Sequence, residues 1–180
     1  MTAVAELLST DVLAGAEELA DVLADAVEGG ASVGFLSPLP RPHAVSWWRA
    51  QAAAVANGVL AVWVARAEGR IVGTVQVRFT STLNGTHRAE VAKLLVLRRA
   101  RGAGLGRRLL AAAERGAAGR GATLLTLDTR TGSPAEALYR SAGWTEVGVI
   151  PDYATDPRGA LHPTTVFFKR LGTPEERRAG

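Results

Sequence analysis

The stretch from residue 88 to residue 141 constrains the fold of this chain more than any other part of the sequence. Arg88–Leu97, rich in aliphatic residues, has the pattern of a buried strand. A loop of glycine and arginine follows, and Leu105–Ala118 then repeats its apolar residues at helical spacing. Ala122–Asp128 predicts a second strand, and Pro134–Ser141 a short helix. Strand, loop, helix and strand in this order predict a βαβ unit, whose two strands run parallel.

The rest of the chain supplies helices and strands around this unit. Helical spacing predicts one amphipathic helix over Asp11–Val27 and a second over about Ala44–Ala56. Segments rich in β-branched residues predict four more strands: Val59–Ala67, Arg70–Phe79, Trp144–Ile150 and Thr164–Leu171. The last two are linked by an irregular stretch at 151–163. The sequence therefore predicts an α/β fold, a mixed sheet of about six or seven strands with about four helices. We expect one domain over residues 1–172 and a polar tail at 173–180.

Composition limits the class of protein further. The 180 residues include no cysteine, which excludes a disulfide framework, a thiolate metal site and a cysteine nucleophile. Acidic residues interrupt every early apolar stretch, and no apolar run approaches the roughly 20 residues that span a bilayer. We therefore expect a cytoplasmic protein with no membrane partner. Because His43, His87 and His162 lack the grouped spacing of a metal site, we also expect no metal.

The net charge of +4 raises the alternative of a nucleic-acid-binding protein. Among the 21 basic residues, however, the lysines are only Lys93 and Lys169. Arginine bias alongside abundant alanine and glycine is as well explained by a GC-rich coding sequence as by contacts with phosphates. We therefore expect no nucleic-acid partner.

The glycine-rich loop at residues 101–106 is the best candidate for a ligand site. Glycine lets the backbone approach a ligand closely, and free N–H groups at a helix N-terminus attract an anion such as pyrophosphate. A Walker loop would need Lys-Ser or Lys-Thr after its last glycine, but Gly106 is followed by Arg107 and Arg108. Glycines at 102, 104 and 106 also miss the Gly-x-Gly-x-x-Gly spacing of a dinucleotide fingerprint.

Two segments resemble the GNAT acetyltransferase family. Arg-x-x-Gly-x-Gly at residues 101–106 is similar to the family's cofactor motif, and residues 135–144 resemble its later Ala-x-x-Leu-Tyr-x-x-x-Gly-Phe segment. The first motif alone could be an ordinary glycine turn at a helix start, but the two together are specific. The resemblance implies the GNAT fold, in which the two parallel strands splay apart and bind the pantetheine arm of acetyl-CoA. The residues it places at the cofactor are Leu95, Val96, Leu97, Arg101, Gly102, Ala103, Gly104, Leu105, Gly106 and Arg107.

Three residues are candidates for proton transfer. Acetylation by a thioester needs a neutral amine, so a group must accept a proton, and the departing thiolate benefits from a donor. By resemblance, Glu90 lies where many GNAT enzymes carry their general base, and Asp128 ends the next parallel strand. Tyr139 is the candidate acid toward the sulfur of CoA. The alternatives are a solvated carboxylate for Glu90, a loop anchor for Asp128 and a core tyrosine for Tyr139.

A closer likeness, over most of the chain, is to the tabtoxin-resistance acetyltransferases. It rests on residues 29–35, 84–85, 88–91, 93–94, 127–129 and 161–164. It implies acetylation of the amino group of a small amino-acid-like toxin or antibiotic. His162 and Trp48 are the candidate substrate-binding residues, and Trp47 is a further candidate for the lining of the acceptor pocket. The alternatives are a plain loop histidine and a tryptophan pair that packs in the core.

Two other functions remain open from the sequence. A protein or peptide N-acetyltransferase would present an open groove instead of a closed pocket. A non-catalytic acyl-CoA sensor would lack a productive base, and the presence of Glu90, Asp128 and Tyr139 together argues against it. The GNAT resemblance is also compatible with a homodimer.

Overall fold

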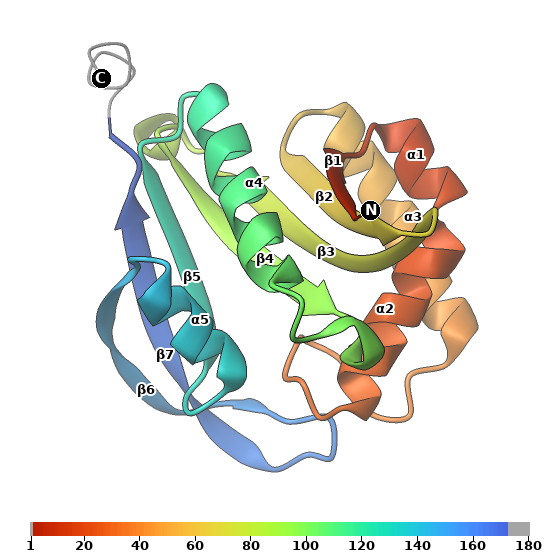
Figure 1. Cartoon of the computed structure of the whole chain (residues 1–180). Helices are drawn as coiled ribbons and strands as arrows, with labels where there is room; N and C mark the ends of the chain where they lie inside the picture. Colours follow the sequence, from red (N-terminus) through yellow and green to blue (C-terminus); the bar gives the residue numbers. More distant parts are fainter. Residues whose placement is uncertain (1, 173–180) are drawn as a thin grey trace.

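The computed structural model describes residues 2–172, and its strands form one seven-stranded sheet. The strands are β1 (Ala3–Glu6), β2 (Leu60–Ala67), β3 (Arg70–Phe79), β4 (Arg88–Val96), β5 (Leu124–Arg130), β6 (Thr145–Thr155) and β7 (Leu161–Arg170). Across the sheet they follow the order β1-β2-β3-β4-β5-β7-β6 (Figure 1). β4 and β5 pair in parallel, whereas the other neighbours pair antiparallel. The predicted mixed sheet is confirmed.

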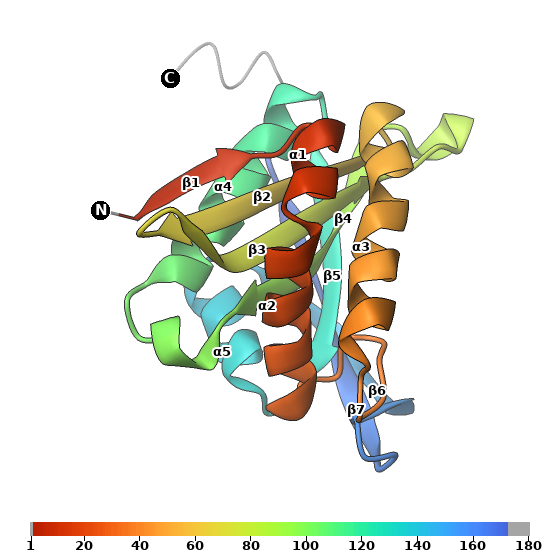
Figure 2. The same ribbon diagram turned by 90° about the vertical axis from the view of Figure 1, so that its right-hand side faces the viewer.

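Helices cover both faces of the sheet. They are α1 (Ser9–Ala14), α2 (Ala16–Glu28), α3 (Arg41–Ala56), α4 (Leu105–Gly119) and α5 (Pro134–Ser141), with 3₁₀ turns at Leu83–Gly85 and Arg98–Ala100. Figures 1 and 2 place α1, α2 and α3 on one face and α4 and α5 on the other. The core accordingly has two layers, with Trp48 and Leu23 buried on the first side and Leu109 and Tyr139 on the second. Within residues 2–172, no helix has both the length and the apolar character needed to cross a membrane.

The predicted βαβ unit is confirmed, since β4, α4, β5 and α5 begin and end within two residues of their expected limits. The prediction of a single helix over Asp11–Val27 was wrong, because α1 and α2 are separated at Gly15. A Cβ at Gly15 would lie 3.1 Å from the carbonyl oxygen of Asp11 and 3.2 Å from the side chain of Ile71. The break therefore brings the backbone close to β3, where only glycine fits without displacing a neighbour.

Two strand assignments also needed the structure. β1 was not predicted, since its four residues are too few to show an alternating pattern. The stretch 151–163 was expected to be irregular, but β6 extends to Thr155 and β7 begins at Leu161. Pro151 and the positive φ of Asp152 (48°) lie at a shift in the β6–β7 register, and such a bulge hides the strand periodicity.

β4 and β5 separate after a short paired segment. Their pairing runs from Arg88 opposite Leu124 to Glu90 opposite Thr126. β4 then continues to Val96 and β5 to Arg130, beyond the paired rows. The two parallel strands are therefore splayed, which leaves a gap in the middle of the sheet.

A bulge in β4 lies beside this gap. In the β3–β4 register, Gln76 pairs with Ala92 and Thr74 with Leu95, so Lys93 and Leu94 together oppose one residue of β3. Lys93 adopts a positive φ of 51°, which is uncommon for a residue with a side chain. Bulges redirect side chains next to functional sites, and here the redirected side chain is a lysine.

Glu136 fixes α5 to the sheet. Its side chain is almost buried, with 8% of the residue exposed, and accepts hydrogen bonds from the N–H of Gly132, the hydroxyl of Thr165 (3.1 Å) and the guanidinium of Arg140 (2.8 Å). The Gly132 N–H, with Arg140 and Thr165, holds the pKa of Glu136 below its usual value. Because Tyr139 lies one turn further along α5, this buried carboxylate also fixes the position of Tyr139.

We expect Glu136→Gln to lower the free energy of unfolding by about 1–3 kcal/mol at neutral pH, the usual cost of an unsatisfied buried hydrogen-bonding group. Since folding lowers the pKa of Glu136, its stabilisation is fully present above the unfolded pKa of about 4.3 and is lost as pH falls through the folded pKa. The difference between wild type and variant should therefore shrink in acid. Urea unfolding at neutral pH and at a pH below the folded pKa of Glu136 tests this, with the exposed Glu68→Gln as the control. A difference that does not change with pH would contradict it.

Candidate functional site

The loop between β4 and α4 has the backbone of an anion site. Gly102 and Gly104 adopt positive φ angles of 83° and 71°. Gly104 precedes α4, and its carbonyl oxygen accepts a hydrogen bond from the N–H of Arg108 (3.1 Å). The N–H groups of residues 105–107 come before this first helical bond and point out of the N-terminus of α4. A Cβ at Gly102 or Gly104 would meet no atom within 4 Å, so the space in front of the loop is open.

Both ends of this loop are anchored in the protein. Leu95, Leu97 and Leu105 are buried. The half-buried Val96 accepts a hydrogen bond at its carbonyl oxygen from Nε of Arg101 (3.1 Å), which ties the loop to the end of β4. A Cβ at residue 106 would approach Leu138 of α5 to 3.2 Å, so the glycine there permits close packing of α4 and α5. Ala103 is exposed at the tip of the loop.

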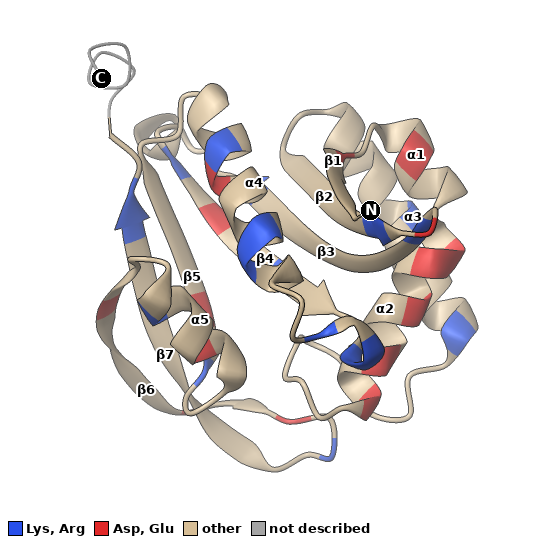
Figure 3. Ribbon diagram, viewed as in Figure 1, with Lys and Arg blue, Asp and Glu red and all other residues tan. Residues whose placement is uncertain are grey.

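Positive charge gathers around the loop. Basic residues lie in the segment before α4 and on its first turn (Figure 3): Arg98, Arg99, Arg101, Arg107 and Arg108. Arg98 is neutralised by Asp25 and Glu28. Arg101, Arg107 and Arg108 instead donate to neutral oxygens of Val96, Ser141 and Thr2. The loop therefore keeps a net positive potential, which suits the phosphate groups of a nucleotide cofactor.

Polar side chains gather on one face of the sheet, at the place where β4 and β5 separate. Residues paired across a sheet point to the same face, and Arg78, Glu90 and Thr126 form one such row. A Cβ at Gly116 of α4 would collide with Trp63, so the row containing Trp63 faces α4 and the row of Arg78 faces the α1–α3 side. Asp128 follows on that side, roughly 7 Å beyond Thr126 along β5. The predicted residues Glu90 and Asp128 therefore lie on the same face, one on each side of the gap.

Asp128 is held between two elements of the site. Its carboxylate accepts a hydrogen bond from the hydroxyl of Thr164 on β7 (3.1 Å), which also donates to the carbonyl oxygen of Thr129 (2.9 Å). The charge of Asp128 contributes to raising the pKa of both Lys93 and Tyr139. The carboxylate therefore acts electrostatically on groups on both sides of the gap.

Tyr139 of α5 lies on the other face of the sheet (Figures 1 and 2). Its ring packs against Trp144 and Phe167, with centroid distances of 5.9 and 6.1 Å. Burial, and to a lesser extent the charge of Asp128, raises the pKa of the phenol well above its usual value. Within residues 2–172, its hydroxyl group forms no hydrogen bond. The proton therefore stays on the phenol at neutral and moderately alkaline pH, and the group can act as a donor.

The two predicted substrate-binding residues occupy different environments. His162 lies on β7, and its Nε2 is 3.0 Å from Oδ2 of Asp156, which lowers the pKa of that carboxyl. Trp48 has none of its surface exposed, whereas its half-buried neighbour Trp47 packs its ring 5.4 Å from Phe35 and 5.7 Å from Nζ of Lys93. Adjacent helical residues point about 100° apart, so Trp48 faces the core and Trp47 faces the site. Of the two tryptophans that the sequence suggests for the acceptor pocket, Trp47 is therefore the better candidate for contact with a substrate.

Lys93 is the charged group of this region that sequence reasoning missed. Its side chain is partly buried, and burial lowers its pKa while Glu90 and Asp128 raise it. Within the described part of the chain, no carboxylate oxygen lies within 4 Å of its Nζ. The signal in the sequence was a lysine inside an apolar strand, in a chain with only one other lysine.

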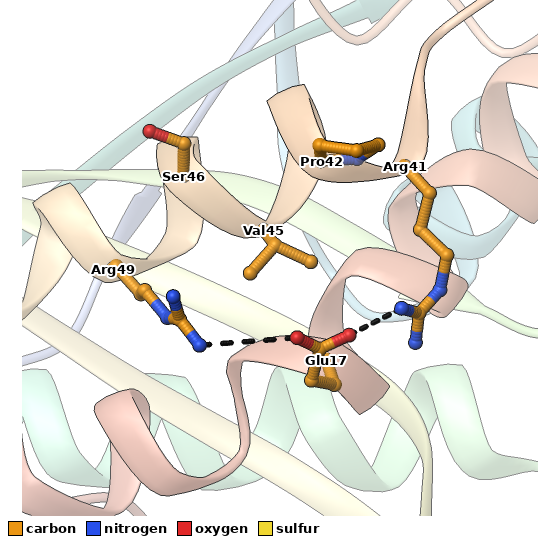
Figure 4. A pocket seen from close by; sticks show the side chains of 6 residues that line it. All are labelled: Glu17, Arg41, Pro42, Val45, Ser46 and Arg49. Atoms are coloured by element: carbon orange, nitrogen blue, oxygen red, sulfur yellow. Dashed lines mark hydrogen bonds and ion pairs between the residues drawn. The ribbon is translucent and has the colours of Figure 1, made fainter.

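Two cavities lie near the α1–α3 side. The first, of about 330 Å³, is lined by Glu17, Arg41, Pro42, Val45, Ser46 and Arg49 (Figure 4). Both of its arginines pair with Glu17, so its charges are already satisfied and nothing there demands a ligand. The second, of about 210 Å³, lies between the end of α2 and the β6–β7 turn and includes Arg130, two residues beyond Asp128 on the same face of β5. This second cavity therefore adjoins the face of the sheet that carries Glu90 and Asp128.

The loop between α2 and α3 is bonded to the β6–β7 hairpin. The hydroxyl of Ser32 donates to the carbonyl oxygen of Thr155 (2.9 Å), and the N–H of Ser37 donates to that of Pro157 (2.8 Å). These bonds join the loop to the end of β6 and to the turn that follows it. In residues 2–172, no cluster of three or more histidine, aspartate or glutamate side chains could hold a metal ion.

Solved structures of proteins described as acetyltransferases have the same fold as this chain. An N-acetyltransferase from Staphylococcus aureus Mu50 superposes with a TM-score of 0.78 at 14% identity, covering 96% of this chain and 99% of its own. The yncA protein of Salmonella typhimurium, solved with its cofactor acetyl-CoA, gives 0.76 at 18% identity, covering 96% and 95%. A ribosomal-protein-alanine N-acetyltransferase from Brucella melitensis gives 0.75 at 25% identity, covering 93% and 99%.

A family model for the acetyltransferase (GNAT) family matches residues 21–144. This range includes the splayed strands, the glycine loop and α5. Because the match spans more than half of the sequence, the chain belongs to the GNAT family of acetyltransferases.

Proposed function

We propose that this protein transfers the acetyl group of acetyl-CoA to a primary amine of a small molecule. This proposal rests mainly on the gap between β4 and β5. β4 leads from Glu90 to the glycine loop, so one elongated ligand along the gap would have phosphate-binding backbone at one end and carboxylates at the other.

The cofactor fits the residues present. Acetyl-CoA supplies an acetyl group activated as a thioester. The N–H groups of residues 102–107 and the unneutralised arginines would bind its phosphates, and the edge of β4 beyond Glu90 would bind its pantetheine arm. The residues assigned to this role are Leu95, Val96, Leu97, Arg101, Gly102, Ala103, Gly104, Leu105, Gly106 and Arg107.

Asp128 and Glu90 are the proposed proton acceptors. An acceptor amine reaches the site as an ammonium ion at neutral pH, and it becomes a nucleophile only after losing a proton. Asp128 is the stronger candidate because Thr164 orients its carboxylate and because it lies close enough to influence Tyr139. Glu90 is exposed and lies on the other strand of the gap, where it would attract the ammonium ion and accept a proton directly or through water.

Tyr139 is the proposed proton donor to the departing sulfur. We expect Tyr139→Phe to lower kcat by about tenfold, less than general acids usually contribute, because a thiol pKa near 8.5 already makes the thiolate a fair leaving group. The Phe ring keeps the contacts with Trp144 and Phe167, so the Tm should change little. Steady-state kinetics and thermal unfolding test this together. Unchanged kcat in a folded variant would exclude the donor role.

A link across the acceptor side supports a small-molecule acceptor over a protein. Ser32 and Ser37 join the α2–α3 loop to the end of β6 and to the β6–β7 turn, and this link would narrow the approach of a large acceptor. The tabtoxin-like segments of the sequence favour an amino-acid-like toxin or antibiotic within this class. A peptide acceptor is the second candidate, supported by the 25% identity to the ribosomal-protein-alanine N-acetyltransferase.

A competition assay distinguishes the two candidates. The protein is incubated with acetyl-CoA and either free amino-acid-like amines or short peptides, and free thiol and acetylated product are measured together. We expect kcat/KM to be higher for the small amines. Faster acetylation of peptides would favour the second candidate, and acetyl-CoA binding without turnover of any amine would favour an acyl-CoA sensor.

A further inference from the structure

We infer that Lys93 selects acceptors that carry an anionic group close to their amine, by binding that group with its ammonium ion. The inference rests on the proposed function and adds a specificity residue to it. Its ligand chemistry is an amine with a nearby carboxylate, as in an α-amino acid. The acceptor's amine would lie toward Asp128 and Glu90, and its anionic group toward Lys93.

The backbone around Lys93 is built to place this side chain. The β4 bulge puts Lys93 and Leu94 opposite a single residue of β3, and Lys93 adopts a positive φ of 51°. For a residue with a Cβ this conformation is uncommon, and a glycine there would have avoided the strain. The observed lysine thus points to a use for the side chain itself.

Two other elements meet the ammonium group from across the acceptor side. Nζ lies 5.7 Å from the ring centroid of Trp47 on α3. A Cβ at Gly34, which has a φ of 86°, would be 4.0 Å from the same Nζ, so the α2–α3 loop passes close to it. An aromatic face attracts a cation but leaves its hydrogen-bonding capacity unused. Lys93 is therefore held in position with donors still available to a ligand.

Charges around Lys93 are arranged for a ligand that carries both signs. Glu90 on β4 and Asp128 on β5 are close enough to raise its pKa, while Arg78 on β3 lowers it. Within residues 2–172, neither carboxylate comes within the 4 Å of an ion pair with Nζ. A partly buried cation without a direct ion pair is costly, and an anionic ligand would offset that cost. The separated positive and negative groups match a zwitterion better than a simple cationic amine.

The test compares free L-amino acids with their L-amino acid amides as acceptors, in the full chain with saturating acetyl-CoA. For Lys93→Met we expect KM for the acids to rise roughly ten- to a hundredfold, the loss of a hydrogen bond to a charged group. KM for the amides should change by less than about threefold, and the Kd of acetyl-CoA should stay the same. Dividing the KM of the variant by the wild-type KM for the same acceptor cancels the different intrinsic reactivity of acids and amides.

Two variants serve as controls. Lys93→Arg keeps the charge and should retain most of the preference for acids. Arg49→Gln removes one positive charge from α3 at the ion-paired cavity of Figure 4 and should alter neither acceptor class. If Lys93→Met fails to fold, as judged by circular dichroism, Lys93→Gln replaces it.

The outcomes separate this inference from the proposed function. An equal loss for acids and amides in Lys93→Met, or a wild-type preference for amides and cationic amines, would overturn the role of Lys93 and leave the acetyltransferase proposal standing. No turnover of any amine together with no binding of acetyl-CoA would remove the proposed function, and the inference with it.

Discussion

Replacement of Gly104 by aspartate should weaken acetyl-CoA binding by at least about a hundredfold, since it sacrifices hydrogen bonds between backbone N–H groups and charged phosphates. Gly104 has a φ of 71° and precedes α4, with open space where its Cβ would be. An aspartate side chain would fill that space and bring a negative charge to the positive end of the helix. It would therefore compete with the phosphates for the same N–H groups.

The same substitution at Gly121 is a matched control. Gly121 also has a positive φ, 87°, and a Cβ there would also meet nothing within 4 Å. It follows the C-terminal end of α4, about 22 Å from Gly104 along a helix of this length. Gly121→Asp therefore carries a similar backbone cost, about 1–2 kcal/mol, without touching the loop. Isothermal calorimetry of a folded Gly104→Asp variant that still binds acetyl-CoA like wild type would contradict the assignment of the loop.

Asp128→Asn should lower kcat by about 10²–10⁴-fold while leaving the Kd of acetyl-CoA unchanged, because the amide can accept a hydrogen bond but cannot take up the amine's proton. The hydroxyl of Thr164 can still donate to the Asn oxygen, so the local structure should persist. Glu90→Gln, measured in parallel, should lower kcat less if Glu90 mainly attracts the ammonium ion.

Asp152→Asn provides the control for loss of one carboxylate. Asp152 is exposed on β6 and has a positive φ of 48°, a conformation that asparagine also tolerates. The kcat of the Asp152→Asn variant should match that of the wild type. The pH dependence of kcat adds a second measurement, since removal of the base should abolish the acidic limb of the profile. A wild-type profile in Asp128→Asn would exclude Asp128 as the base.

The sequence predicts most of the elements that build the proposed cofactor site, because they are local. Residues 88–141 alternate clear strand and helix patterns, and the glycines of the loop mark the helix start directly. The limits of β4, α4, β5 and α5 therefore follow from periodicity within two residues. That Glu90 and Asp128 lie on one face depends on the β4–β5 register, which pairs Glu90 with Thr126 and which periodicity alone does not define.

The proposed acceptor side could not be predicted in the same way, because it depends on contacts between distant segments. Whether Trp47 or Trp48 faces the site depends on the rotation of α3 against the sheet, which the weak periodicity of that helix does not define. Lys93 reaches the acceptor side through a bulge, and an alternating pattern cannot reveal a shift in pairing with β3. The link through Ser32 and Ser37 joins residues more than 100 positions apart.

Acetyl transfer itself is measured by incubating the protein with acetyl-CoA and a panel of amines, with free thiol and product mass followed together. The panel contains tabtoxinine-like amino acids, aminoglycosides, polyamines and short peptides. We expect release of CoA in equal amount to an N-acetylated product, fastest for the amino-acid-like amines. Failure to bind acetyl-CoA, together with no thiol release from any member of the panel, would contradict it.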